Sequence, residues 1–331
     1  MRNLNFKYFL LLALGVLVAC GNSNKQSDQP QEEEKDIMAP EFNADSAYAY
    51  VKAQCDFGPR IPNSQAHAQC GEWLVSKFKE FGATVYEQKD KVRGWDGTVL
   101  DMHNIIASYK PETKKRVMIC AHWDSRPWAD NDPDDKLHHT PIDGADDGAS
   151  GVGILLELAR QLQMQETAIG IDLICFDLED YGTPQWYDGQ HDENSWCLGS
   201  QYWSRRQHVD GYNARFGILL DMVGNANARF YQEYFSKRLA GNIVNKVWKK
   251  AHDIGVGVYF PKKDGGGVTD DHIPVNNIAR IPCIDIIPNY PNSDSGFGPV
   301  WHTVNDNLNN IDKMTLKVVG QVMMQVIYNE K

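Results

Sequence analysis

The feature that most constrains the fold is an alternation of two kinds of apolar segment. RVMICA (116–121), IDLICF (171–176) and GILL (217–220) are short and mostly apolar, whereas ASGVGILLELARQLQ (149–163) repeats its apolar residues with the period of a helix. Strands without a polar alternation are typical of parallel sheets that are buried on both faces. The sequence therefore predicts a single α/β domain with a central, twisted, mixed and mostly parallel sheet flanked by helices on both faces.

Other segments extend this pattern toward both ends of the chain. A helix is expected over 63–82, with Asn63 or Ser64 as its N-cap and Gly82 at its end. We expect an early strand pair at 84–88 and 100–109, a helix over 237–255, a buried strand within 278–288 and a final helix within 312–331. Since no internal repeat and no linker is recognised after residue 40, the catalytic domain is predicted to span residues 43–331.

The N-terminus has the pattern of an export signal. Two basic residues precede an apolar run that is too short to cross a membrane, and the run ends at Cys20. The sequence around Cys20 resembles a bacterial lipobox, so we expect a signal peptide at 1–19, lipidation of Cys20 and an acidic flexible tether at 20–42. The alternative is a plain signal peptide with an incidental cysteine. In both cases we expect the protein to be exported, and in the first case it is lipid-anchored to a bacterial membrane, facing the periplasm or the surface.

Charge and cysteine usage narrow the possible partners and cross-links. The formal net charge is -11 and the mature chain has no basic cluster, which argues against nucleic acid as a partner. Export permits disulfides, and a Cys55–Cys70 pair is the one bridge we expect. The other thiols in apolar strands, Cys120, Cys175 and Cys283, are expected to be small core residues.

Polar residues gather where the apolar strands end. In open α/β sheets ligands bind beyond the carboxyl ends of the strands, so these residues are expected to meet there. Crowded carboxylates repel one another and resist burial, which calls for a positive charge among them. Imidazoles and carboxylates without a cysteine suit Zn²⁺ held by nitrogen and oxygen. The candidates are His122, Asp124, Asp146, Asp147, Glu179, Asp180, Asp221, Asp270, Asp271, His272 and His302.

Two adjacent acids in this set are predicted to have different tasks. Glu179 and Asp180 follow one another on a backbone that is extended or turning, so their side chains point in different directions. One can bind a metal ion while the other remains within reach of a substrate as a proton shuttle.

Several motifs resemble a known family. HWDS, GADDGASGVGILLELA and DLED resemble the zinc-dependent exopeptidases of the M28 type. DDHIPV and PVWHTVNDNLNNID resemble a narrower branch, the animal-type glutaminyl cyclases and their bacterial relatives. The resemblance extends from about residue 43 to the end and implies a glutaminyl-peptide cyclotransferase, which converts an N-terminal glutamine of peptides or proteins to pyroglutamate and releases ammonia.

The resemblance also implies roles for particular residues. It makes Glu179 the general acid/base, pairs Asp221 with Asp270 by a hydrogen bond, and makes Trp301 and Trp186 substrate-binding, with the position of Trp186 less well matched. A single zinc ion would bind Asp147, Asp180 and His302. The chain departs from the family in having Asp180 where the middle ligand is usually Glu, and in lacking the disulfide found beside the site in animal members.

Two other functions are compatible with the same residues. In a dinuclear zinc aminopeptidase, His122, Asp147 and Asp221 would hold a second ion, and Glu179 would activate water. A metal-free binding module would have lost its ligands, whereas none of the candidate positions is apolar here. Metal content distinguishes the cyclase from the aminopeptidase, because the cyclase would hold one zinc ion per chain and the aminopeptidase two.

Overall fold

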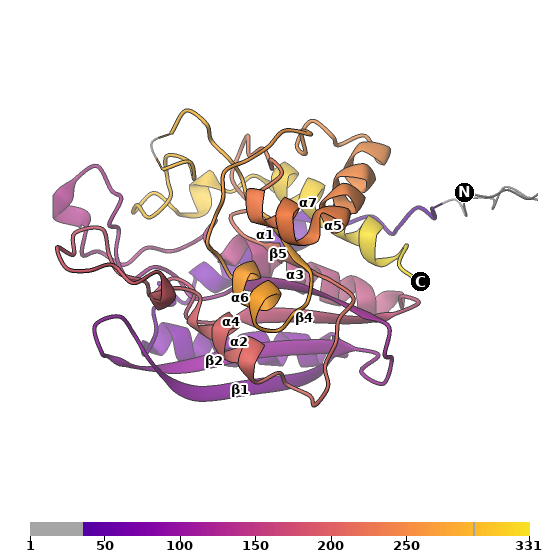
Figure 1. Cartoon of the computed structure of the whole chain (residues 1–331), viewed down its shortest axis with the longest axis horizontal. Helices are drawn as coiled ribbons and strands as arrows, with labels where there is room; N and C mark the ends of the chain where they lie inside the picture. Colours follow the sequence, from indigo (N-terminus) through magenta and orange to yellow (C-terminus); the bar gives the residue numbers. More distant parts are fainter. Residues whose placement is uncertain (1–35, 294) are drawn as a thin grey trace, which may run out of the picture. The chain divides into compact units, whose positions relative to one another are not determined.

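The computed structural model describes residues 36–293 and 295–331, and its compact unit spans Ile37–Lys331 (Figure 1). The expected signal peptide, Cys20 and nearly all of the tether therefore lie outside the described residues. One six-stranded sheet has the order β1-β2-β4-β3-β5-β6. Only β2 runs against the others, so the sheet is mixed and mostly parallel, as predicted. Its strands are β1 Thr84–Arg93, β2 Val99–Tyr109, β3 Arg116–His122, β4 Gly170–Phe176, β5 Gly217–Leu220 and β6 Cys283–Ile286.

Helices cover both faces of the sheet because successive strand residues point in opposite directions. Ile119 and Ala121 of β3 face the larger core, while Met118 and Cys120 face a smaller one. The larger core is closed by α1 Ala44–Cys55, α2 Gln65–Glu80, α3 Ala149–Met164, α5 Tyr234–Asp253 and α7 Lys313–Ile327. The smaller core is closed by α4 Leu198–Arg205 and α6 His272–Asn277, which lie side by side (Figure 1). Within the described residues, every helix is too short or too polar to cross a membrane.

The predicted strands and helices are confirmed, and three further helices were not predicted. The helices expected over 63–82, 149–163, 237–255 and 312–331 correspond to α2, α3, α5 and α7. Ser64 caps α2 by accepting a hydrogen bond from the backbone N–H of His67 at 3.0 Å. The unpredicted helices are α1, which has a weak apolar stripe, and the short α4 and α6.

The N-terminal boundary of the domain lies earlier than predicted. Residues 37–42 were assigned to the tether, but Phe42 is 1% exposed and its backbone N–H donates to Gln321 Oε1 on α7 at 2.8 Å. A Cβ on Gly320 would approach the Phe42 ring to 2.4 Å, so glycine is required for this contact. Residues 37–42 therefore belong to the compact unit, because an apolar side chain anchors them to α7.

The expected Cys55–Cys70 disulfide is wrong. Both residues are free thiols that pack into the larger core from α1 and α2. Burial raises the pKa of Cys55 to about 11 and that of Cys70 to about 12, so both remain protonated and unreactive. Cys120, Cys175 and Cys283 are buried free thiols, as predicted.

Candidate metal centre and active site

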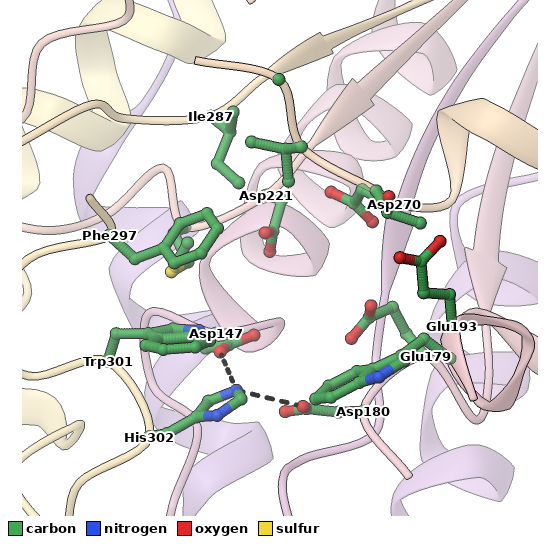
Figure 2. Close-up of a pocket in the computed structure, with 15 residues that line it drawn as sticks. Asp147, Glu179, Asp180, Glu193, Asp221, Asp270, Ile287, Phe297, Trp301 and His302 are labelled. Atoms are coloured by element: carbon green, nitrogen blue, oxygen red, sulfur yellow. Dashed lines mark ion pairs between the residues drawn. The ribbon is translucent and has the colours of Figure 1, made fainter. Parts of the chain in front are cut away.

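The candidate site lies at the carboxyl ends of the central parallel strands. His122 is the last residue of β3, while Glu179 and Asp180 follow β4 and Asp221 follows β5. Together with late loops they enclose a cavity of about 270 Å³ (Figure 2). Its lining consists of Asp147, Glu179, Asp180, Glu193, Trp196, Asp221, Met222, Gly267, Val268, Thr269, Asp270, Ile287, Phe297, Trp301 and His302.

Three buried side chains at the base of this cavity form a candidate metal site. Asp147, Asp180 and His302 offer ligand atoms that all lie within 4.8 Å of one another. His302 Nε2 is 3.2 Å from Asp180 Oδ1 and 3.6 Å from Asp147 Oδ2 (Figure 2). Neither oxygen of Asp180 accepts a hydrogen bond from the described part of the chain, which is costly for a buried carboxylate. One imidazole nitrogen and two carboxylates fit Zn²⁺ and leave a coordination position for a substrate.

A buried ion pair orients the histidine of this set. Asp130 Oδ1 lies 3.2 Å from His302 Nδ1, so the other ring nitrogen faces the two carboxylates. Asp130 is itself held by Arg126 at 2.6 Å, and Arg126 also donates to the backbone carbonyl of Asp180 at 2.8 Å. Burial alone would raise the pKa of Asp130, but His302 and Arg126 hold it below its ordinary value. This pair links two candidate ligands that are far apart in the sequence.

Two further carboxylates fix the backbone beneath the candidate ligands. Asp124 accepts the backbone N–H groups of Glu179 and Asp180, both at 3.1 Å. Asp306 does the same for Asp146 and Asp147, at 2.8 and 3.1 Å. Asp124 also lies near a histidine, since its Oδ1 is 3.5 Å from His122 Nδ1. Its shorter contacts, however, are with the two backbone amides, so its main role is to fix the backbone of Glu179 and Asp180 just after β4.

A second set of possible ligands shares Asp147 with the first. His122 Nε2 lies 2.9 Å from Asp147 Oδ1 and 3.2 Å from Asp221 Oδ1. The expected hydrogen bond between Asp221 and Asp270 is not found among the contacts of the described residues; Asp221 contacts His122 instead. Burial and the charge of Asp221 raise the pKa of Asp270 to about 7. The arrangement therefore brings these two acids close enough to interact, while the geometry of a second metal set is retained.

Glu179 faces the cavity beside the first set and belongs to neither set. Its carboxylate, Asp270 and Cys197 offer atoms within 4.8 Å of one another. Burial raises the pKa of Glu179 well above its ordinary value, opposed by the nearby His122. A carboxyl group with a raised pKa next to a metal site can both accept and return a proton.

Aromatic rings form the walls of the cavity. Trp301 stacks on the His302 ring, with ring centroids 3.9 Å apart, and Trp196 lies parallel to the same ring at 6.1 Å. Trp186, expected to bind substrate, is not among the lining residues. It packs against Trp128 and His139, at 5.6 and 4.4 Å between centroids. The wall expected from Trp186 is thus provided by Trp196, ten residues later.

Backbone strain is concentrated next to the site. Leu178, Cys197, Met222 and His302 all have positive φ, between +47° and +55°, although none is a glycine. Met222 and His302 line the cavity, Leu178 precedes the lining residue Glu179, and Cys197 contacts Glu179 through its thiol. Such strain persists only where surrounding structure enforces it and is common at functional sites.

Sequence reasoning missed several residues that shape the site. Arg126 and Asp130 lie in SRPWAD (125–130), and neither was among the candidate residues. The signal that could have identified them is the arginine four residues before an aspartate in the segment that directly follows β3. Trp196, Phe297, Ile287 and Glu193 had no signal, because their places in the lining depend on how long loops return to the sheet.

The family model for peptidase family M28 matches residues 104–327, and the chain belongs to this family. Several of the solved structures to which the chain is most similar are glutaminyl cyclases. The crystal structure of the Bacteroides thetaiotaomicron glutaminyl cyclase bound to N-acetylhistamine is 58% identical, with a TM-score of 0.87, over 88% of this chain and 100% of that chain.

Among the other relatives, some are named as aminopeptidases and some as glutaminyl cyclotransferases. A structure described as a leucine aminopeptidase precursor from Bacteroides thetaiotaomicron is 57% identical, with a TM-score of 0.87, over 90% of this chain and 100% of that chain. The glutaminyl-peptide cyclotransferase of Boiga irregularis is 25% identical over 66% of this chain. The match spans 63% of that curated relative's length.

Proposed function

We propose that this chain is a glutaminyl-peptide cyclotransferase that acts on peptides or proteins with an N-terminal glutamine. The observation that carries the proposal is a carboxylate, Glu179, that faces a small aromatic-walled cavity beside the ligand set but belongs to neither candidate set. A cavity of about 270 Å³ suits one curled side chain better than an extended peptide. The similarity to bacterial glutaminyl cyclases at more than half of aligned positions supports the same reaction.

The metal part of the proposal is a single Zn²⁺ held by Asp147, Asp180 and His302. When bound there, the ion would supply Lewis acidity toward the γ-carbonyl oxygen of the glutamine. The chain's own contribution is to fix the ligands: Asp130 orients His302, and Asp124 and Asp306 hold the backbone of Asp180 and Asp147. This support is needed because Asp180 is a shorter ligand than Glu and depends on the position of its backbone.

The proton is moved by Glu179. The α-amine nitrogen of the substrate attacks the γ-carbonyl carbon, so a C–N bond forms and the five-membered lactam closes. Glu179 accepts the proton that the amine loses and returns it to the departing amide nitrogen, which leaves as ammonia when its C–N bond breaks. Trp301 and Trp196 enclose the side chain, which favours the curled conformer and excludes water as a competing nucleophile.

The second candidate function is a dinuclear aminopeptidase, favoured by one specific observation. His122, Asp147 and Asp221 have the proximity that a second ion requires. In that case Glu179 would activate a water molecule rather than the substrate amine.

One assay separates the two functions. Purified protein is incubated with a glutamine-initiated dipeptide and, in parallel, with an aminoacyl chromogen, while metal is counted per chain. Ammonia release without amino-acid release, at about one zinc per chain, supports the cyclase. Release of the first amino acid with two zinc ions supports the peptidase and refutes the proposal.

We also propose that the protein is exported and anchored through a lipid on Cys20, as the pattern at residues 1–20 supports. The test is metabolic labelling with a fatty acid, comparing the natural sequence with Cys20→Ala. Label on the natural protein alone supports the anchor. Equal labelling, or none on either chain, refutes it.

A further inference from the structure

Cys197 is a buried cysteine at the start of α4 whose thiol points at Glu179. Its Sγ lies 3.4 Å from Glu179 Oε1, and the residue is 2% exposed. Within the described residues, this thiol is the only group recorded as donating a hydrogen bond to the Glu179 carboxylate. A thiol is a weak donor, and the 3.4 Å between Sγ and Oε1 is within the distance at which sulfur forms such a bond.

The backbone of Cys197 fixes the same acid from behind. Its N–H donates to the carbonyl of Glu179 at 3.0 Å, and the next N–H, of Leu198, donates to Leu178 at 2.9 Å. Asp124 holds the Glu179 N–H from the other side. These hydrogen bonds fix the backbone of Glu179. The thiol can therefore act only on the torsion angles of the Glu179 side chain.

The conformation of Cys197 indicates that this placement is enforced. Its φ is +55°, a region that cysteine rarely adopts, and α4 has no side-chain cap at this position. This conformation occurs at the residue whose thiol contacts Glu179.

We propose that Cys197 is a positioning residue for the cyclisation: its S–H donates to Glu179 Oε1, so that Oε2 is directed at the nitrogen atoms between which the proton moves. The inference rests on the proposed function. Burial raises the pKa of the Cys197 thiol well above its ordinary value, and the nearby acids raise it further, so the group stays a neutral donor. A donor at one oxygen limits rotation of the carboxyl, and orientation of a catalytic group is worth large factors in rate.

The kinetic test compares Cys197→Ala, Cys197→Ser and a matched control, Cys70→Ala, which removes a buried thiol of α2 that does not line the cavity. Cys197→Ala should lower kcat roughly tenfold while KM stays within about twofold. Cys197→Ser keeps a donor and should recover most of the loss, and Cys70→Ala should keep the natural kcat. Zinc content and melting temperature are measured for each variant.

Equal kcat in Cys197→Ala and the natural protein would overturn the inference, as would equal losses in Cys197→Ala and Cys197→Ser. The first result excludes any role for the side chain and the second reduces it to packing. A natural protein that releases no ammonia refutes the proposed function instead, so the two failures are distinguishable.

A spectroscopic readout tests the contact without activity. The S–H infrared stretch of Cys197, identified by its loss in Cys197→Ser, should move to higher frequency in Glu179→Ala, because the acceptor is removed. A band that moves only in Asp270→Asn would assign the thiol to that neighbour and overturn the inference.

Discussion

Strand β4 carries one buried acid, Asp172, near its start, and Glu179 and Asp180 follow shortly after its end. Asp172 and Asp180 differ in how many hydrogen bonds their carboxylates accept. At the start, Asp172 accepts from Arg116 at 2.5 and 2.6 Å, from Ser108 at 2.6 Å and from Tyr212 at 2.7 Å. Past the end, neither oxygen of Asp180 accepts a hydrogen bond from the described chain. Both acids are buried to the same degree.

The difference separates a structural site from a chemical one. A buried carboxylate with every lone pair used and a guanidinium beside it has no capacity left for a ligand. Asp180 lies next to other acids, and its nearest positive groups are His302, 3.2 Å from its Oδ1, and Arg126 at 3.8 Å, neither of which uses up its lone pairs. Such a carboxylate keeps lone pairs for a ligand and gains from a further positive charge. The region around Asp172 therefore should govern stability, and the region around Asp180 should govern metal binding and turnover.

The largest effect is expected from Glu179→Gln. Loss of the proton acceptor should lower kcat roughly 10²- to 10⁴-fold, because general acid/base catalysis contributes that much. Ammonia release measures the loss, and zinc content should be unchanged since Glu179 belongs to neither candidate metal set. Retention of full activity would remove the proton-shuttle role.

Arg116→Met should have the opposite profile. It leaves Asp172 buried without its cation, which should lower the free energy of unfolding by about 3–5 kcal/mol, measured in denaturant. At a temperature where the variant is folded, kcat should match the natural protein. The double variant Arg116→Met with Asp172→Leu should recover most of the stability, because no charge then remains uncompensated. A lower kcat in the folded Arg116→Met variant would show that the Asp172 region also governs turnover, which contradicts the proposed division between the two regions.

Asp130→Asn should weaken zinc binding roughly 10- to 100-fold, as loss of the partner of a ligating histidine does. The measurement is competition with a chelator of known affinity. His302→Ala is the reference variant and should lose zinc altogether. Unchanged affinity in Asp130→Asn would show that the ring needs no carboxylate to hold its orientation.

The smallest effect is expected from Tyr212→Phe. Removing one of the donors to Asp172 should cost about 1 kcal/mol of stability, without changing kcat or zinc content. A thermal melt of the two proteins measures it. A loss as large as that of Arg116→Met would mean that hydroxyl and guanidinium act as one unit.

The sheet and most of its covering helices were predictable because periodicity records burial directly. The short α4 and α6 lack enough residues to show a period, and only tertiary packing defines them. Strand ends also identified Glu179, Asp180 and Asp221, and the start of α3 identified Asp147, since topology brings such positions together. Trp196 could not be found in this way, because its position depends on the path of a long loop, whereas Trp186, which the resemblance indicated, is not among the residues that line the cavity.

The position of Asp147 between two ligand sets has a consequence for engineering. Because this carboxylate borders both sets, the proposed single-ion centre would need no new ligand to hold a second ion. Directed evolution toward peptide hydrolysis should therefore collect its first beneficial substitutions in the surroundings, at bulky or acidic neighbours such as Trp301 and Asp270, while the ligating side chains stay as they are.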